Sequence, residues 1–338
     1  MDNSKLGVPI EGLADFSRKA AAEGAVLLRN ENEILPLTAT DRVAVFGRCQ
    51  IEYYRSGTGS GGAVNVAYKT NLLQGLRDSG RVQVNEKLAA VYEKWIQENP
   101  FDDGGGGWAC EPWSQKEMPL TEEIVREAAE NSDKAIVVIG RTAGEDKDNK
   151  AEEGSYLLTE AEADMIQKTA DAFTDVIVVL NVPNVIDMSF LHTTRNADHL
   201  KAVIYAWQGG MEGGNAIADV LTGKVTAQGK LTDTIAKKIT DYPSDRNHGG
   251  EDKNIYQEDI YVGYRYFETF NKDAVLFPFG YGLSYTGFSI EQGDSYTRQR
   301  DNMQEFAFEC KVRNMGTKYS GREIVQVYVE GPQQGMGS

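Results

Sequence analysis

The sequence predicts an α/β domain, with a mostly parallel sheet between two helical layers, followed by the first strands of an all-β sandwich. Three observations support this fold class. Four short segments are apolar at nearly every position, helical stretches separate them, and the pattern changes to strict alternation toward the C-terminus. Uniformly apolar segments are typical of parallel strands that are covered on both faces, whereas alternation is typical of half-buried antiparallel strands.

The four apolar segments are rich in β-branched residues and are too short for buried helices. This composition predicts strands of a central sheet. We expect the α/β domain to occupy residues 1–235. The four predicted strands are Val43–Gly47, Ala135–Gly140, Val176–Asn181 and Ala202–Trp207.

Two helices are predicted between these strands. Leu120–Asn131 carries apolar residues at helical spacing. Thr159 and Glu162 form a capping box, in which each side chain accepts a hydrogen bond from the other residue's backbone amide, and this box opens a helix through Ala172. Helices that alternate with buried strands predict three layers, helix, sheet and helix.

The C-terminal part has a different pattern. Residues 236–286 form a connecting segment that is first polar and then aromatic, and residues 287–338 are predicted to begin a second domain. Strands are predicted at Phe306–Asn314 and Ile324–Val329, where apolar and polar residues alternate. A sandwich of this type needs about seven strands and about 100 residues, so we expect this domain to be incomplete.

Composition excludes several classes of function. The net charge of −16 opposes binding to nucleic acid, which requires clustered cations. The apolar segments are too short to cross a membrane. Three histidines without ligand spacing predict no metal site. Three widely spaced cysteines predict reduced thiols, and therefore a cytoplasmic location unless a leader has been removed.

A glycine-rich loop follows the first strand. Gly57, Gly59 and Gly62 match the spacing of a dinucleotide-binding fingerprint. The loop starts about ten residues after its strand and does not lead directly into a helix, which opposes that interpretation. Two interpretations stay open. The loop is either a flexible surface loop or a close-approach loop, in which the glycine backbone and the hydroxyl of Ser60 contact a ligand.

A cluster of carboxylates follows the second strand. In open α/β sheets, functional groups gather beyond the carboxyl ends of the strands, and Glu145 lies in such a position. Hydrolysis of a glycosidic bond requires two carboxyl groups, which makes this segment a candidate site. Charged loops are usually only solvated, however, and on spacing alone Glu152 and Glu153 are equally good candidates.

Five separated stretches of the chain have a family-like sequence. They are Lys19–Leu37 (KAAAEGAVLLRNENEILPL), the SGTGSGG loop, Ala135–Asn149 (AIVVIGRTAGEDKDN), Ala202–Leu231 and Tyr256–Phe288, which contains FGYGLSYT. Through these stretches the chain resembles glycoside hydrolase family 3, the β-glucosidase and β-xylosidase family. The resemblance extends over nearly the whole chain and implies an α/β sandwich domain followed by a fibronectin type III-like domain.

The resemblance also implies functional residues. Glu145 corresponds to the general acid/base of the family, and the loop with Gly59, Ser60 and Gly61 corresponds to a loop that contacts the sugar. One departure is that Asp146-Lys147 follows Glu145, where many members have Gly-Tyr. No organic cofactor or metal is implied.

The family's nucleophile is an Asp in a TIM-like barrel. No segment here has its sequence pattern, and a barrel needs about 250 residues, for which there is no room. We therefore expect the barrel to lie outside this chain, on the same protein or on a second chain. If Met1 is the true start, the chain resembles the minority of the family in which the barrel follows the sandwich.

The implied substrates are β-linked oligosaccharides or aryl and alkyl β-glycosides, cleaved at the terminal sugar with retention. A homo-oligomer is compatible with the sequence. Two rival functions are a non-catalytic carbohydrate-binding or scaffold module and, with less support, a nucleotide-binding oxidoreductase.

Several aromatic and acidic residues have two interpretations. Trp108 and Trp113 flank a run of glycines and are compatible with a wall for the leaving group or with buried anchors of a loop. An aromatic cluster before the predicted sandwich is interpreted as a packing seam between domains, with a platform for a sugar as the alternative, and two nearby carboxylates are interpreted as structural. The cluster comprises Tyr261, Tyr264, Tyr266 and Phe267, and the carboxylates are Glu258 and Asp259.

Overall fold

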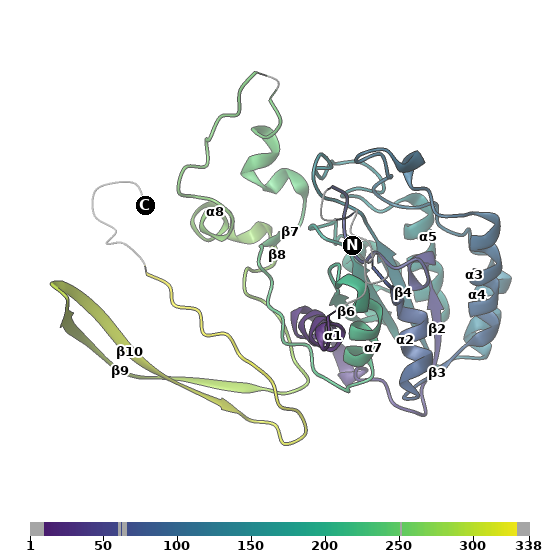
Figure 1. Cartoon of the computed structure of the whole chain (residues 1–338), viewed down its shortest axis with the longest axis horizontal. Helices are drawn as coiled ribbons and strands as arrows, with labels where there is room; N and C mark the ends of the chain where they lie inside the picture. The colour runs from purple at the N-terminus through teal and green to yellow at the C-terminus, as the bar shows by residue number, and fades with distance from the viewer. Residues whose placement is uncertain (1–9, 60–61, 63–65, 251, 330–338) are drawn as a thin grey trace, which may run out of the picture.

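The computed structural model describes residues 10–59, 62, 66–250 and 252–329. Its centre is a six-stranded sheet with the strand order β1-β6-β5-β4-β2-β3 (Figure 1). Five neighbouring strands, β6, β5, β4, β2 and β3, run parallel, and β1 pairs with β6 in the antiparallel direction. The strands are β1 Val26–Asn30, β2 Arg42–Phe46, β3 Gln83–Val84, β4 Lys134–Gly140, β5 Val176–Asn181 and β6 Leu200–Tyr205.

The predicted fold class is confirmed, and all four predicted strands are present, as β2, β4, β5 and β6. β5 has the predicted bounds, and the ends of the other three differ by at most two residues, because strand ends depend on the pairing of the last residues. The two edge strands, β1 and β3, were not predicted. β3 has only two residues, and β1 runs antiparallel to the rest of the sheet, so neither shows the long apolar pattern of a central strand.

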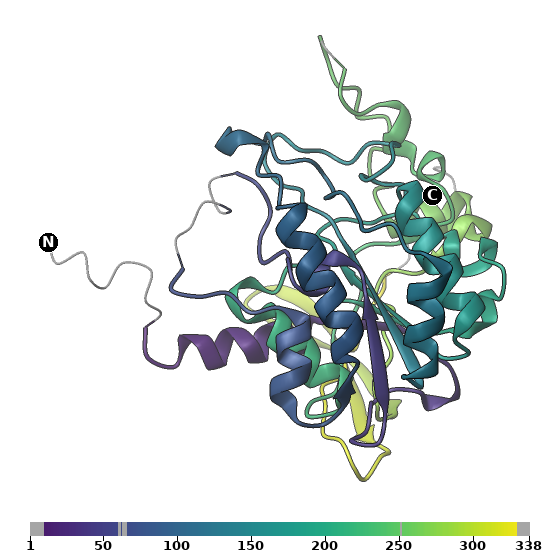
Figure 2. The ribbon, with the colours of Figure 1, turned by 90° about the vertical axis from the view of Figure 1, so that its right-hand side faces the viewer.

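Helices cover both faces of the sheet, which makes the predicted three layers (Figures 1 and 2). In β4, Ala135, Val137 and Ile139 pack on one helical layer, and Ile136 and Val138 pack on the other. One layer is formed by α3 Glu86–Glu98, α4 Glu122–Glu130 and α5 Glu160–Ala172 with the short α6 Phe190–Thr193, and the other by α1 Leu13–Gly24, α2 Leu72–Ser79 and α7 Gly213–Leu221.

Both predicted helices are confirmed. The first is α4, whose N-terminus is capped by the Thr121 side chain, which accepts a hydrogen bond from the amide of Ile124. The second is α5, in which both hydrogen bonds of the Thr159–Glu162 capping box are present. These caps satisfy amides that the first turn of a helix leaves without partners. The capping box fixes the start of α5, which follows the loop that carries Glu145.

The connecting segment contains β7 Ile235–Ala236, α8 Tyr264–Phe270 and β8 Val275–Phe277. Its aromatic residues pack on one another, and their role as a seam between domains stays a prediction. Phe267 is buried and meets Tyr242 edge-on with ring centroids 5.5 Å apart, and Tyr264 stacks on Phe279 at 5.0 Å. Tyr264 also contacts Tyr328, at 5.6 Å. Glu258 and Asp259 lie in the turn before α8, where the Glu258 carbonyl accepts the amide of Tyr261.

The C-terminal part contains one long antiparallel hairpin, β9 Phe288–Arg300 and β10 Met303–Asn314, which extends away from the α/β domain (Figure 1). The predicted strand at 306–314 is therefore present within β10. The predicted strand Ile324–Val329 is wrong for this structure, because these residues have no strand pairing. A strand needs a neighbour for its backbone amides and carbonyls, and none is found here among the described residues.

Candidate active site

Two loops meet beyond the carboxyl ends of β2 and β4, as expected for an open α/β sheet. The amide of Thr58, in the glycine-rich loop, donates to the carbonyl of Ala143, 2.8 Å away. Thr58 and Gly144 form a bridge of the parallel type. A Cβ on Gly57 would lie 1.8 Å from the Ala143 carbonyl oxygen, so only glycine allows the two loops to approach this closely.

The predicted residues Gly59 and Glu145 lie in contact. Gly59 has a φ of +94°, and a Cβ added to it would lie 2.7 Å from the Cβ of Glu145. The glycine loop therefore packs directly on the candidate acid, and the side chain of Glu145 is exposed beside it. Ser60 and Gly61, the other two predicted sugar contacts, lie outside the described residues. The glycine loop is therefore packed on the acid loop, and its contact with a ligand stays a prediction.

The loop geometry opposes a dinucleotide site. In the fingerprint, the last glycine opens a helix whose N-terminus binds the pyrophosphate. Here α2 does not begin until Leu72, well after Gly62. The glycine positions instead bring the backbone against Ala143 and Glu145.

The beginning of the acid loop is fixed by a buried ion pair. The guanidinium of Arg141 donates to both carboxylate oxygens of Glu162, with 2.7 Å between Nη2 and Oε2, and both side chains are buried. Arg141 also donates to the carbonyl of Ser155. Burial lowers the pKa of Arg141, but the Glu162 carboxylate outweighs it and raises that pKa above its ordinary value. Glu162 therefore serves two purposes, since it also caps α5.

A buried amide links the neighbouring loops at the end of β5. The Asn181 side chain accepts a hydrogen bond from the amide of Tyr54 and donates to the carbonyls of Tyr54 and Trp207. The Asn181 carbonyl accepts the amide of Arg141 at 3.2 Å. One residue at the end of the central strand thus holds the chain segments that lead to the glycine loop and to the acid loop.

A third loop, containing Trp108, contacts the acid loop from another side. The indole Nε1 of Trp108 donates to Oδ2 of Asp146 at 2.8 Å, and Nζ of Lys147 donates to the Ala109 carbonyl at 3.2 Å. Trp113 is half-buried below them, with Lys147 over its ring at 5.1 Å, and its carbonyl accepts the amide of Thr142. Trp113 is therefore an anchor of the loop, whereas the Trp108 side chain is exposed.

The rival carboxylates have no comparable surroundings. Glu152 and Glu153 are exposed in the turn before α5, where backbone hydrogen bonds tie them to Ser155 and Leu157. In the described part of the chain, no hydrogen bond or ion pair joins either of them to the glycine loop. Contact with Gly59 distinguishes Glu145 from both.

One carboxylate near the acid loop, Glu111, was not predicted from the sequence. Glu111 is half-buried, and burial raises the pKa of its carboxyl, although the Thr142 hydroxyl and the Lys147 ammonium partly oppose the effect. Glu111 and Gly57 both line a hollow of about 380 Å³. A larger hollow of about 820 Å³ lies between residues 36–39 and 318–322 and is lined by none of the predicted site residues that the structure describes.

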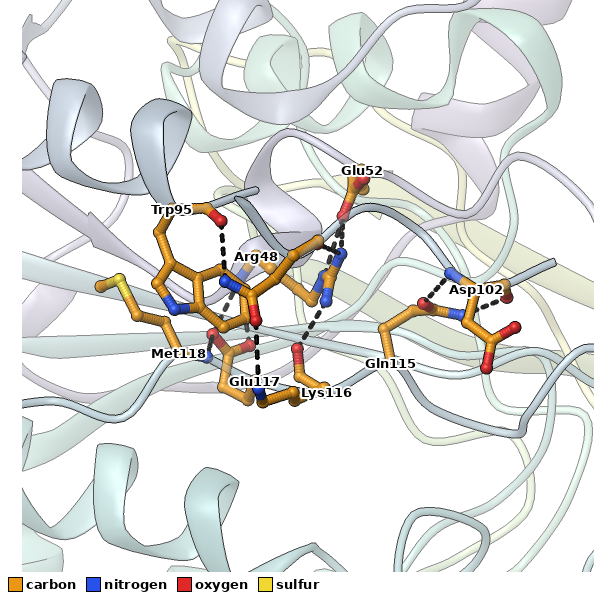
Figure 3. Close-up of polar contacts among 9 residues, drawn as sticks. Arg48, Glu52, Trp95, Asp102, Gln115, Lys116, Glu117 and Met118 are labelled. Carbon is orange, nitrogen blue, oxygen red and sulfur yellow. Dashed lines mark hydrogen bonds and ion pairs between the residues drawn. The ribbon is translucent and has the colours of Figure 1, made fainter. Parts of the chain in front are cut away.

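A second missed carboxylate, Glu117, follows the Trp108 loop along the chain, and Figure 3 shows its contacts. Glu117 is buried, and its carboxylate accepts the amides of Arg48 and Met118, at 3.0 Å and 2.7 Å. Burial raises the pKa of Glu117 to about 7 against these two hydrogen bonds, which lower it. No periodicity signals such a residue, because Glu117 lies in an irregular segment and its partner Arg48 is far away in the sequence.

Glu117 makes the stability of this domain depend on pH. Its carboxyl has a usual pKa of 4.5 and holds its proton up to about pH 7 in the folded chain. Between these values the folded state binds more protons, so the contribution of Glu117 to the free energy of unfolding should fall by roughly 3 kcal/mol as the pH rises. Glu117→Gln, measured by urea unfolding from pH 4.5 to 8, should flatten this slope. The exposed Glu123→Gln should keep it, and identical slopes for the wild type and Glu117→Gln would contradict the assignment.

The described residues contain no cluster of three His, Cys, Asp or Glu side chains that is arranged to hold a metal ion. None of their helices has the length and apolar character needed to span a bilayer. The cysteines are unpaired, with Cys49 buried and Cys110 and Cys310 exposed.

Comparison with known proteins identifies relatives of this architecture. Residues 25–285 match the family described as the glycosyl hydrolase family 3 C-terminal domain. A β-glucosidase from Ruminococcus albus is 50% identical over 326 residues, which are 96% of this chain and 33% of that protein. β-Glucosidase A from Butyrivibrio fibrisolvens is 37% identical over 360 residues, covering 96% of this chain and 42% of that protein.

Solved structures show the same likeness. A β-glucosidase from Paenibacillus barengoltzii shares 59% identity with a TM-score of 0.91, covering 94% of this chain and 34% of its own. β-Glucosidase 3B from Thermotoga neapolitana, solved in complex with glucose, shares 34% identity with a TM-score of 0.78, covering 90% of this chain and 42% of its own. This chain thus spans about a third of the R. albus relative. Its match over residues 25–285, in the α/β fold described above, shows that the chain belongs to the glycosyl hydrolase family 3 C-terminal domain family.

Proposed function

We propose that this chain is part of a β-glucosidase that removes terminal β-D-glucosyl residues with retention, and that it supplies the general acid/base, Glu145. The observation that carries the proposal is the contact between Gly59 and Glu145, which joins the sugar-binding loop and the acid loop implied by the family resemblance. The names of the relatives, all β-glucosidases, support the glucoside as substrate class.

The mechanism requires a second carboxylate. In retaining hydrolysis, a nucleophilic carboxylate bonds to the anomeric carbon while the general acid protonates the departing oxygen, and the same residue then takes a proton from the attacking water. In this proposal, Glu145 performs both proton transfers. The nucleophile is an Asp of a TIM-like barrel outside this chain, and the chain's coverage of only about a third of the R. albus relative leaves room for such a domain.

Glu145 lies at the exposed end of a loop whose base is fixed. Its side chain is exposed in this chain, and Lys147 lies two residues away, held against Trp113 and the Ala109 carbonyl. The buried Arg141–Glu162 pair and Asn181 fix the start of the loop. The loop is therefore anchored at its base, while the side chain of Glu145 is exposed, and in this proposal a second domain covers the substrate that binds beside it.

The organisation of the rest of the chain belongs to the same proposal. Residues 1–235 form the α/β sandwich domain, residues 236–286 connect, and residues 287–338 begin a fibronectin type III-like domain whose remaining strands lie outside this chain. The exposed apolar side chains of the β9–β10 hairpin, Ile290, Phe306, Phe308 and Val312, support a missing partner sheet.

The proposal is tested by comparing this chain with the whole protein. The whole protein should release nitrophenol from p-nitrophenyl β-D-glucoside, and proton NMR should show β-glucose as the first product. This chain alone should show no turnover, because it lacks the nucleophile. Sustained turnover by the chain alone, with its mass verified, would contradict the division of the site. Absorbance of a bound nicotinamide or flavin in the purified whole protein would favour the oxidoreductase instead.

A further inference from the structure

Trp108 is the only exposed tryptophan of the four in this chain, all of which the structure describes, and 55% of its surface is accessible. A single exposed aromatic residue needs no special explanation. Trp108 differs because its polar end is already satisfied by Asp146, next to Glu145 in the sequence, while the ring is left uncovered. The position of this ring relative to the candidate acid is therefore fixed by a hydrogen bond.

The loop that carries Trp108 has a closed neck (Figure 3). The Gln115 side chain accepts the amide of Asp102 at 2.7 Å and donates to the Asp102 carbonyl at 2.9 Å, which joins the two ends of residues 102–115. Below this point, the buried Arg48 guanidinium donates to the carbonyls of Lys116 and Asn99, at 2.6 Å and 3.0 Å. These contacts make the loop a compact unit attached to the end of β2.

The tip of the loop is also compact. A Cβ on Gly104 would lie 2.2 Å from the backbone of Cys110, and one on Gly107 would lie 2.7 Å from the Cys110 sulfur. Lys147 provides a second link to the acid loop through the Ala109 carbonyl, at 3.2 Å. Neck and tip together limit the freedom of Trp108, and an ordered platform loses less entropy when a ligand binds to it.

We propose that Trp108 forms the binding platform for the leaving group of the substrate. The inference rests on the proposed function. A general acid lies beside the glycosidic oxygen, so the leaving group extends past Glu145. The exposed indole of Trp108, which is bound to Asp146, lies next to this position. An indole face stacks well on a phenyl ring or on the apolar face of a second glucose, whereas it makes little contact with a methyl group. Trp108 would therefore determine specificity for the leaving group and take no part in the proton transfers.

The two-step mechanism makes this role separable from a structural one. The leaving group departs in the first step, so hydrolysis of the glycosyl-enzyme by water no longer involves it. Trp108→Ala in the whole protein should lower kcat/KM about tenfold for cellobiose and p-nitrophenyl β-D-glucoside. It should change kcat/KM for methyl β-D-glucoside less than twofold. Turnover of a dinitrophenyl glucoside limited by the second step should keep its kcat. Trp108→Phe, which keeps a ring, should restore most of the loss.

A second measurement uses the glycosyl-enzyme directly. Its partition between water and an acceptor depends on how the acceptor binds and reacts, and not on the first step. In Trp108→Ala, transfer to added cellobiose should fall about tenfold relative to water, while transfer to methanol should not change. Equal losses on all substrates, methyl glucoside included, would make Trp108 structural. No change on any substrate or acceptor would place the leaving group elsewhere. If the wild type hydrolyses no β-glucoside, the proposed function itself fails, which is a different result.

Discussion

Replacing Glu145 by Ala in the whole protein should abolish most hydrolysis of cellobiose, with kcat/KM reduced by roughly 10²–10⁴, the contribution typical of a general acid. An alkoxide leaving group needs a proton, whereas a dinitrophenolate leaves without one. The first step on a dinitrophenyl glucoside should therefore be nearly unaffected, and the covalent glycosyl-enzyme should accumulate because its hydrolysis still requires a base. The measurement is a burst of dinitrophenol followed by slow turnover with a lowered KM.

Two further readouts separate catalysis from folding in the same variant. Added azide needs no general base, so it should restore turnover and yield β-glucosyl azide. The alkaline side of the pH–rate profile should disappear, because that side reports ionisation of the acid. Glu152→Ala and Glu153→Ala are matched controls in the same turn region and should show none of these effects. A uniform loss on every substrate, without an azide product, would make Glu145 a structural residue.

The second large effect concerns stability. Arg141→Met should lower the free energy of unfolding by about 3–5 kcal/mol, because it leaves the Glu162 carboxylate buried without its partner. The double variant Arg141→Met/Glu162→Met should recover a large part of this loss, since replacing both members removes the uncompensated charge. Urea unfolding followed by tryptophan fluorescence measures both variants.

An exposed ion pair provides the control for this experiment. Arg42 and Asp133 also form a bidentate pair, but their side chains are 48% and 44% exposed. Arg42→Ala should therefore cost no more than about 1 kcal/mol. A comparable loss in both variants would show that burial does not decide the contribution of Arg141. The activity of Arg141→Met should fall as well, because the base of the acid loop loses its attachment to α5.

Much of the fold follows from local patterns in the sequence. The four central strands are predicted because strands covered on both faces must be apolar at successive positions, and Ile136 and Val138 indeed face one helical layer while Val137 and Ile139 face the other. The start of α5 is predicted because Thr159 and Glu162 are close in sequence and satisfy each other's backbone amides. The edge strand β1 is a limit of this approach, because its pairing with β6 depends on residues far away in the chain.

The candidate site divides in the same way. The residue pattern alone does not separate Glu145 from Glu152 and Glu153, and only the family resemblance favours it. The contact with Gly59 that now distinguishes it joins loops after two different strands. Burial and electrostatics are equally non-local. The pKa of Glu117 rises to about 7 because distant segments exclude water from it. The residues next to Glu117 in the sequence do not indicate this burial.

The amino-acid sequence therefore determined the four central strands, the capping box of α5 and the glycine positions, whose causes lie within a few residues. The tertiary structure decided which loops meet. It paired Arg141 with Glu162, packed Gly59 on Glu145 and fastened Trp108 to Asp146. These contacts arise because neighbouring parallel strands bring the loops at their carboxyl ends to one edge of the sheet, whatever the distance between those loops along the chain.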